Sequence, residues 1–352
     1  MNRPENPIAA VVHRDPYPYY ASLVELAPMA RDETLGMWVA ASAEAAHAVL
    51  TSERCRVRPA SEPVPAAIVG TTAGSIFARL VRMRDGAAHA GPRCTVVREL
   101  DVIDAQRVGQ EAAEEARSLL GSGGSIAHLV LRLPARVMAR VLGVSPAELD
   151  RTAEWVDDFA GCLAPGASPG RVTRGRAAAE RLLERMVGDV DLAANRVGLL
   201  AQAYEATAGL IGNTLVAIGR SHALRERLRG HPEHVDALLD EVLRNDPPVQ
   251  NTRRFAALGG SIAGVEVREG DTILVVLAAA QRDPAARGAL AFGAGVHTCP
   301  GAKHAKAIAA PAIREVLTTG LDLGALVDTV AYRPSANLRV PLFSAAAPLV
   351  AS

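Results

Sequence analysis

Residues 292–301 read Phe-Gly-Ala-Gly-Val-His-Thr-Cys-Pro-Gly. This decapeptide places one cysteine, Cys299, between a glycine-rich loop and a run of residues compatible with a helix. Gly293 and Gly295 allow the tight turns with which a backbone approaches a flat ligand closely. Pro300 suits the first position of a helix, where its missing N–H costs nothing. The pattern therefore predicts a loop that presents one thiol at the start of a helix.

We expect that helix to cover residues 299–310 and to be bent or interrupted at Pro311. The sulfur of Cys299 would then face the free N–H groups of Gly301 and Ala302, and the positive end of the helix would favour thiolate over thiol. A lone, pre-organised thiolate is a suitable ligand for heme iron. The alternative is a buried free cysteine in a turn, which is the commoner situation for a cysteine taken alone.

The complete pattern Phe-Gly-x-Gly-x-His-x-Cys-x-Gly changes this balance, because it resembles the heme-binding loop of the cytochrome P450 family. The resemblance implies that Cys299 is the axial ligand of the iron and hence the metal ligand of the chain. It also implies that Phe292 packs near the thiolate and that His297 lies beside a heme propionate. Gly293 and Gly301 belong to the same implied cofactor-binding loop.

Two other segments resemble heme-binding motifs of the same family. In Asp85-Gly-Ala-Ala-His-Ala-Gly-Pro-Arg93, one helical turn separates His89 from Arg93 and puts both on one face. Two donors on one face suit a carboxylate, and an arginine fork suits it best, although a surface His–Arg pair is the alternative. In Gln250-Asn-Thr-Arg-Arg-Phe-Ala256, the resemblance implies that Arg254 reaches a heme propionate.

A third segment, Glu241-Val-Leu-Arg244, resembles the family's Glu-x-x-Arg helix and is followed by two prolines. The resemblance implies a structural ion pair between Glu241 and Arg244, although an i,i+3 pair on a helix is more often a solvated surface feature. The family then has a meander whose arginine joins this pair. Here residues 285–291 lead directly to the cysteine loop, so either Arg287 is the third partner or the pair stands alone.

Residues 192–219 are low in charge and predict a long, buried helix. Its centre, Gln202-Ala-Tyr-Glu-Ala-Thr207, resembles the family's oxygen-binding helix, whose usual form is Ala-Gly-x-Asp/Glu-Thr-Thr. Glu205 matches the acid, Ala203 stands at the glycine, and Ala206 stands where the alcohol is expected. Thr207 replaces that hydroxyl only awkwardly, because one residue rotates a side chain by about 100° around a helix.

The missing alcohol bears on the chemistry, because heme-thiolate cleavage of dioxygen needs protons that a hydroxyl, an acid and ordered water deliver. The resemblance makes Glu205, Ala206 and Thr207 the candidate catalytic positions. Without the hydroxyl, either ordered water completes the relay or reducing power is lost as peroxide. The sequence leaves both alternatives open.

The resemblance spans nearly the whole chain in the family's order. It implies a mainly α fold with small β-sheets, heme between the long central helix and the cysteine-loop helix, and a single domain over residues 1–352. In the family the substrate pocket is built from the stretch that corresponds to residues 56–84, from the long helix near Ala203 and Tyr204, and from Gln250 and Asn251. These segments include polar groups, so we expect a small, partly polar organic substrate.

The composition of the chain narrows the classes of function that remain. The chain has 38 basic and 38 acidic residues and gives no support for nucleic-acid binding. The absence of a Cys-x-x-Cys pair disfavours a zinc or iron–sulfur site, and the cysteines do not suggest a disulfide framework. No signal-length apolar run opens the chain, and no stretch of about 18 uncharged apolar residues occurs. We expect a compact, soluble, bacterial-type cytoplasmic protein with no membrane partner; its cysteines are Cys55, Cys94, Cys162 and Cys299.

Three functions are compatible with these motifs. The first is a heme b monooxygenase, as in specialised metabolism, that takes electrons from a separate ferredoxin and reductase, because the chain contains no flavin or iron–sulfur motif. The second is a peroxide-dependent or non-oxygenating heme-thiolate enzyme, for rearrangement or dehydration, which would tolerate Ala206. The third is a non-catalytic heme-binding partner protein.

Overall fold

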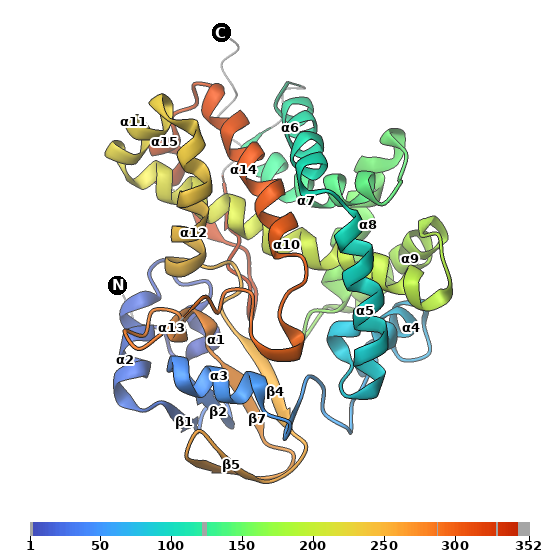
Figure 1. Ribbon diagram of the computed structural model, residues 1–352, viewed down its shortest axis with the longest axis vertical. Coiled ribbons are helices and arrows are strands. Elements are labelled where there is room, and N and C mark those ends of the chain that lie inside the picture. The colour runs from blue at the N-terminus through green and yellow to red at the C-terminus, as the bar shows by residue number, and fades with distance from the viewer. Residues whose placement is uncertain (1–2, 122–124, 287, 329, 344–352) are drawn as a thin grey trace.

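The computed structural model describes residues 3–121, 125–286, 288–328 and 330–343. Helices form the upper part of the view in Figure 1, and the largest sheet lies below them with the N-terminal helices. This confirms the expected mainly α fold with small β-sheets. The α-helices are α1 Pro7–Ala10, α2 Tyr17–Leu26, α3 Ala43–Thr51, α4 Thr72–Arg79, α5 Ala87–Val102, α6 Ala105–Gly121, α7 Ile126–Val141, α8 Leu149–Cys162, α9 Pro169–Arg185, α10 Val190–Arg220, α11 His222–Gly230, α12 Val235–Asn245, α13 Leu277–Ala280, α14 Ala302–Thr318 and α15 Leu323–Val327.

The largest sheet has the strand order β1-β2-β7-β4-β3, with β2 parallel to β7 and the other neighbours antiparallel. Two-stranded sheets, β5-β6 and β8-β9, complete the β-structure. The strands are β1 Met29–Asp32, β2 Met37–Ala40, β3 Cys55–Arg56, β4 Thr252–Ala256, β5 Gly260–Ile262, β6 Val265–Val267, β7 Thr272–Val275, β8 Ala331–Tyr332 and β9 Pro341–Leu342.

Helix α10 runs through the middle of the helical part and confirms the predicted long helix. Most of its residues are buried against α7, α14 and α15. A stripe of water-accessible residues interrupts this burial at Leu199, Gln202, Ala203 and Ala206. Spacings of three and four residues place them on one face of the helix. One face of α10 is therefore left open at the segment that resembles the oxygen-binding motif.

The helix after the cysteine loop differs from the expectation. Helix α14 begins at Ala302 rather than at Cys299, and it continues through Pro311 to Thr318. Proline removes the N–H that would have bonded to the carbonyl of Ala307. A side chain at Gly109 of α6 would lie 3.6 Å from that carbonyl and 3.7 Å from the Pro311 ring. The close packing of α6 at Gly109 therefore supports the helix where proline weakens it.

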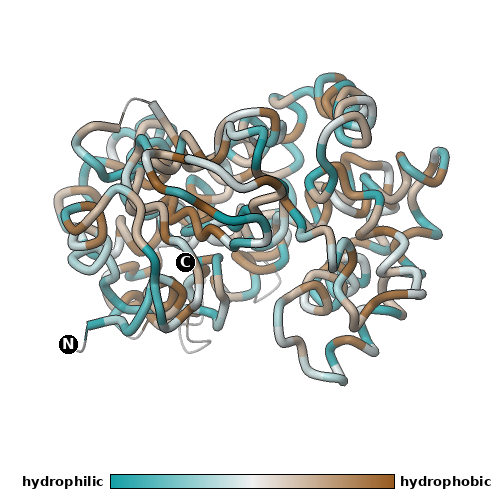
Figure 2. Tube along the Cα trace, turned by 90° about the horizontal axis from the view of Figure 1, so that it is seen from below, coloured by the Kyte–Doolittle hydropathy of each residue, from teal (hydrophilic) through white to brown (hydrophobic). Residues whose placement is uncertain are grey.

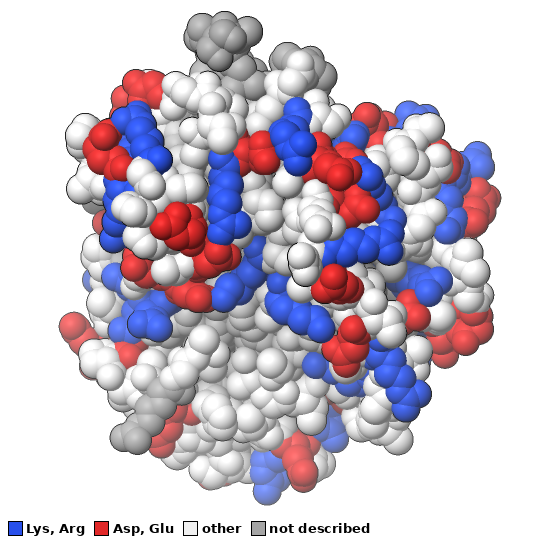
Figure 3. Space-filling view, turned by 45° about the horizontal axis from the view of Figure 1, so that its top comes forward, with Lys and Arg blue, Asp and Glu red and all other residues white. Residues whose placement is uncertain are grey.

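Along most helices, hydrophilic and hydrophobic positions alternate in the hydropathy-coloured trace (Figure 2), as expected for helices with one buried side. Acidic and basic side chains are interspersed on the face shown in Figure 3, in keeping with the balanced charge of the chain. Among the described helices, none is both long and apolar enough to cross a membrane. That the whole chain forms one domain remains a prediction.

Candidate functional site

The cysteine loop has the tight backbone that its glycines predict. Gly293 has φ +74° and Gly295 has φ +70°, a left-handed conformation that side chains other than glycine adopt at a cost. At Gly295 a Cβ atom would also lie 3.0 Å from the carbonyl oxygen of Leu50 in α3. The N–H of Cys299 donates to the carbonyl of Phe292 over 2.9 Å and closes the loop. The loop thus holds Cys299 at its end, with the residue exposed to solvent.

The charge state of Cys299 differs from the simple helix-end expectation. Surrounding protein raises the pKa of the thiol above its ordinary value, and the Gly301 N–H and the charge of Arg93 only partly oppose this. The helix begins three residues later than expected, so the thiol receives one backbone N–H rather than two. The protein alone therefore keeps Cys299 as a thiol, and a bound metal would be needed to deprotonate it.

Two histidines and an aspartate meet beside this loop. The rings of His89 and His297 lie with their centroids 4.4 Å apart. Nε2 of His297 is 3.1 Å from Oδ1 of Asp85, whose other oxygen accepts the N–H of Val57 over 3.0 Å. His89 is only 4% exposed, and its Nε2 has no hydrogen-bond partner. A buried nitrogen without a partner is costly, so this atom is suited to a polar group of a bound ligand.

The electrostatics of the cluster follow from burial and from these contacts. Burial lowers the pKa of His89, and the neighbouring His297 and Arg93 lower it further. Burial by itself would raise the pKa of Asp85, but the hydrogen bonds from His297 and from the N–H of Val57 hold it below its ordinary value. The cluster is therefore built for a neutral His89 and an ionised Asp85.

We expect this cluster to make the fold acid-sensitive in two steps. Below the ordinary histidine pKa of 6.5, the unfolded chain protonates His89 more readily than the folded chain, so the free energy of unfolding falls. Near and below the ordinary aspartate pKa of 3.8, the contribution of Asp85 is lost as well. Urea unfolding of wild type and His89→Phe at several pH values measures this. An equal decline in both proteins between pH 6.5 and 5 would contradict the role of His89.

Two arginines add donors to the same region. Arg254 on β4 is 7% exposed, and no carboxylate within the described chain pairs with it; its guanidinium donates to the carbonyl of Arg253 over 2.9 Å. Burial lowers the pKa of Arg254, and electrostatic interactions with Asp85 and Cys55 only partly oppose this. Arg93 on α5 donates to the carbonyl of Thr298 in the cysteine loop. Arg254 is thus a buried cation that forms no ion pair in the described structure, although Asp85 is near enough to act on its pKa, and a bound anion would offset the cost of burying it.

These contacts fit the heme that the sequence motifs imply. The free Nε2 of His89 and the unpaired Arg254 are suitable donors for the two carboxylates of a heme, and Arg93 lies at the same loop. The exposed sulfur of Cys299 is a suitable iron ligand. His297 is already bonded to Asp85, so its ring shapes the site and leaves less donor capacity for a propionate. Phe292 is half-buried and packs against the helical core next to the loop.

The residues on α10 are divided between two surroundings. Ala203 and Ala206 lie on the accessible stripe, whereas Thr207 is buried with 1% exposure. Oε1 of Glu205 is 3.4 Å from the guanidinium Nε of Arg333, and burial raises the pKa of Glu205 while Arg333 opposes it. The structure therefore offers a carboxyl group held near an arginine, and no hydroxyl at position 206.

The predicted pocket residues Tyr204, Gln250 and Asn251 form hydrogen bonds to other parts of the protein. The hydroxyl of Tyr204 donates to Asp157 of α8 over 3.0 Å and accepts from Arg333 over 3.0 Å. Gln250 is fully buried, and its side chain donates to the carbonyl of Pro247. Asn251 donates to the carbonyl of Ala336. Each side chain thus supports local structure, and their predicted contact with substrate stays a prediction.

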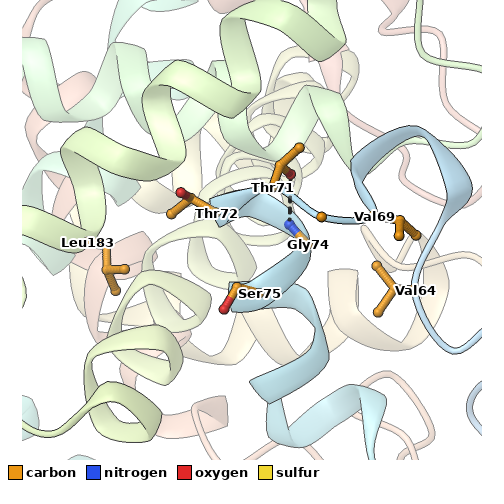
Figure 4. A pocket seen from close by; sticks show the side chains of 8 residues that line it. Val64, Val69, Thr71, Thr72, Gly74, Ser75 and Leu183 are labelled. Carbon is orange, nitrogen blue, oxygen red and sulfur yellow. Dashed lines mark hydrogen bonds between the residues drawn. The ribbon is translucent and has the colours of Figure 1, made fainter.

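A pocket of about 540 Å³ lies within the other predicted part of the binding region (Figure 4). It opens between two parts of the chain. One is the segment that leads into α4 together with the start of that helix, and the other is helix α9. The hydroxyl of Thr71 accepts the N–H of Gly74 at its edge, which caps α4. That residues 56–84 contribute to substrate binding stays a prediction. The pocket is lined chiefly by Val64, Val69, Thr71, Thr72, Ser75 and Leu183.

The predicted ion pair between Glu241 and Arg244 does not form. Both residues are exposed on α12, and no ion pair joins them in the described part of the chain. Gln281 and Arg282, which precede the shortened segment, instead bond to the carbonyls of Leu243 and Asn245 at the end of α12. The shortened chain therefore anchors at the helix end and leaves the Glu-x-x-Arg face in water. Arg287, the other suggested partner, lies outside the described residues.

Comparisons with known proteins agree with the observed fold. 6-Deoxyerythronolide B hydroxylase of Saccharopolyspora erythraea is 28% identical over 386 residues, which cover 93% of this chain and 94% of that protein. The structure of P450BioI with a ligated acyl carrier protein superimposes with a TM-score of 0.78 at 21% identity, covering 94% of this chain and 99% of that one. The chain belongs to the cytochrome P450 family. No family model matches it.

Local sequence matches to this P450 are stronger but shorter. A cytochrome P450 140 of Mycobacterium tuberculosis is 34% identical over 138 residues, which cover 35% of this chain and only 32% of that protein. Family membership therefore fixes the fold and the kind of cofactor, since P450 proteins bind heme. The activity of this P450, its substrate and its partners are matters for a proposal.

Proposed function

We propose that this P450 is a heme-thiolate oxidoreductase that binds heme b through Cys299 and oxidises a small organic molecule. The observation that supports the proposal is the cysteine loop itself, which ends at an exposed Cys299 and whose His297 ring lies 4.4 Å from the ring of His89, a histidine with an unpartnered Nε2. The buried Arg254, which forms no ion pair in the described structure, adds a second possible donor. One sulfur ligand and donors for two carboxylates are the groups that a heme needs. Heme b, when bound, supplies the redox-active iron for oxidation.

The residues of the chain divide the remaining work. His89, Arg93 and Arg254 would hold the propionates, and His297 would shape the site from its bond to Asp85. Glu205 would hold a proton near the open face of α10, since burial raises its pKa. Ala203 and Ala206 leave room on that face. Electrons would come from a ferredoxin and its reductase, and the cytoplasmic location expected from the sequence stays a prediction.

A second candidate function follows from one specific observation. Ala206 leaves the accessible stripe of α10 without the hydroxyl that would orient protons, and Thr207 is buried where it does not replace it. A peroxide-dependent or non-oxygenating reaction requires less of such a relay. The turnover assay that separates the two uses NAD(P)H with a surrogate ferredoxin and reductase in one arm, and hydrogen peroxide alone in the other. Turnover in neither arm would contradict the proposal that the protein is an oxidoreductase.

The Ala206→Thr variant gives the sharper comparison. We expect the wild-type protein, driven by NAD(P)H in the presence of a ligand that shifts its heme spectrum, to lose much of its reducing power as peroxide. Ala206→Thr should lower the peroxide released per NAD(P)H consumed, because it restores a proton-directing hydroxyl on the open face. Peroxide-driven turnover should change little.

A control for this experiment is Ala217→Thr, which adds the same hydroxyl to a half-buried position of α10 away from the stripe. It should leave the peroxide ratio at the wild-type value. Tight coupling in the wild-type protein that Ala206→Thr leaves unchanged would show that water, Thr207 or the substrate already supplies the proton path.

A further inference from the structure

Arg82 is a cation without a partner in a chain whose arginines are mostly paired. It lies in the short 3₁₀ helix Val81–Met83, between α4 and α5, and it is exposed. No hydrogen bond or ion pair involves its side chain in the described part of the structure. Its neighbours Arg79 and Arg84, by contrast, lie 3.1 Å and 3.8 Å from the carboxylate of Asp191. The difference makes Arg82 available to an external anion.

The backbone around Arg82 is fixed in place. The N–H of Val81 donates to Oδ1 of Asn195 on α10 over 2.9 Å, and the side chain of Val81 packs against Val96, Leu100 and Leu199. Met83 packs against the main helical core. Because the residues on both sides turn into the core, the side chain of Arg82 is directed away from it. Arg82 is therefore held in position by its neighbours rather than by a partner of its own.

This position lies between the open face of α10 and the cysteine loop. A Cβ atom on Gly198 of α10 would lie 2.5 Å from Leu80, so the segment before Arg82 rests on that helix. Gln202, one turn further on the accessible stripe, donates to the Gly198 carbonyl over 2.8 Å. Three residues after Arg82, Asp85 binds His297 of the cysteine loop. Arg82 thus belongs to a segment that contacts α10 at Leu80 and the cysteine loop at Asp85.

The electrostatic surroundings agree with this geometry. Protein atoms around Arg82 lower its pKa to about 10, and no carboxylate opposes the shift. The residue is nevertheless exposed to solvent. The guanidinium fork of an exposed arginine that has no partner is free to bind a carboxylate or phosphate through two parallel hydrogen bonds.

We infer that Arg82 binds an anionic group, a carboxylate or a phosphate monoester, on the substrate of this protein. The inference rests on the proposed function, because it assigns the charge of the molecule that the heme site would oxidise. The side-chain amide of Gln202, which donates one N–H to the Gly198 carbonyl, keeps one further neutral donor on the open face. The stretch 56–84 was predicted from the sequence to contribute to the pocket, and Arg82 is the residue that gives it a charge preference.

The inference is tested with matched ligands and the purified holoprotein. The probes are 4-phenylbutyrate, 3-phenylpropyl phosphate and the neutral 4-phenylbutanamide, and calorimetry measures their dissociation constants. We expect at least one of the two anions to bind about tenfold more tightly than the amide, as for a charge-assisted hydrogen bond. Arg82→Gln should remove this preference, whereas Arg82→Lys should retain part of it. Comparison of the two anions distinguishes a carboxylate from a phosphate ligand.

The controls separate this inference from its alternatives. Arg227→Gln changes another exposed arginine, on α11, whose side chain forms no hydrogen bond or ion pair in the described part of the chain, and it should keep the wild-type preference. The heme-to-protein ratio of Arg82→Gln should equal that of wild type, and loss of heme would instead assign Arg82 to a propionate. Equal binding of acids and amide, or a preference that persists in Arg82→Gln, would overturn the inference. Calorimetry does not need the heme, so a wild-type protein that binds anions through Arg82 but no heme would contradict only the proposed function.

Discussion

Replacing Cys299 with alanine is expected to remove thiolate-bound heme from the protein. Cys299 is the single cysteine of residues 292–301, and it is exposed at the end of that loop. Without an axial ligand, the propionate contacts alone would have to retain the cofactor. We expect the heme-to-protein ratio of Cys299→Ala, measured after gel filtration, to fall to a small fraction of the wild-type value.

The other cysteines provide the controls. Cys94 is exposed like Cys299 but lies on α5, while Cys55 and Cys162 are buried. Burial raises the pKa of the Cys162 thiol to about 11 and raises that of Cys55 as well. Because the surroundings of Cys299 also raise its pKa, it is the position of Cys299 in the exposed loop that separates it from these two. Alanine variants of these three should keep the wild-type heme content. Retention of heme by Cys299→Ala together with loss in one of the others would place the iron ligand elsewhere.

Replacing Arg254 with alanine should give the second largest effect. The affinity for heme should fall, whereas the free energy of unfolding of the apoprotein should not. A charge-assisted hydrogen bond contributes about 1.5–3 kcal/mol, which corresponds to roughly a 10- to 100-fold loss of heme affinity. The heme-free protein should keep or gain stability, because the variant removes a buried cation that forms no ion pair in the described structure. Heme transfer to an acceptor protein measures the first effect and urea unfolding of the apoprotein measures the second.

Arg253→Ala is the matched control for this variant. Arg253 is the preceding residue of β4, so its side chain points to the opposite face of the strand, and it has no ion pair in the described structure. It should leave heme affinity close to the wild-type value. If Arg254→Ala destabilises the apoprotein and leaves heme affinity unchanged, Arg254 is a structural residue and the propionate assignment is wrong.

The sequence predicted those features that depend on local geometry. Two glycines with positive φ, a cysteine at the end of their loop and a long helix of low charge are each specified by a few neighbouring residues. The family resemblance then placed His89, His297 and Arg254 near one another, and the structure brings His89, His297 and Asp85 into contact. Asp85 was part of a quoted motif, but its role as the partner of His297 needed the fold.

Other features could not be predicted because they depend on packing between distant segments. Arg333 meets Glu205 and Asp157 across 128 or more residues, and no spacing in the sequence points to that cluster. The helix after the cysteine loop passes through Pro311, at a place where Gly109 of α6 packs closely against it. The absence of an ion pair between Glu241 and Arg244 also depends on distant packing, since the shortened segment leaves that face of α12 uncovered.

The central claim is that this P450 binds heme through a cysteine thiolate, and the carbon monoxide difference spectrum of the reduced wild-type protein tests it most directly. Heme should first be supplied during expression, so that the site has the opportunity to fill. The account predicts one heme per chain and the strongly red-shifted Soret band that a thiolate ligand produces. A protein that takes up no heme, or one whose carbon monoxide complex shows the unshifted Soret band of a histidine- or thiol-ligated heme, would contradict it.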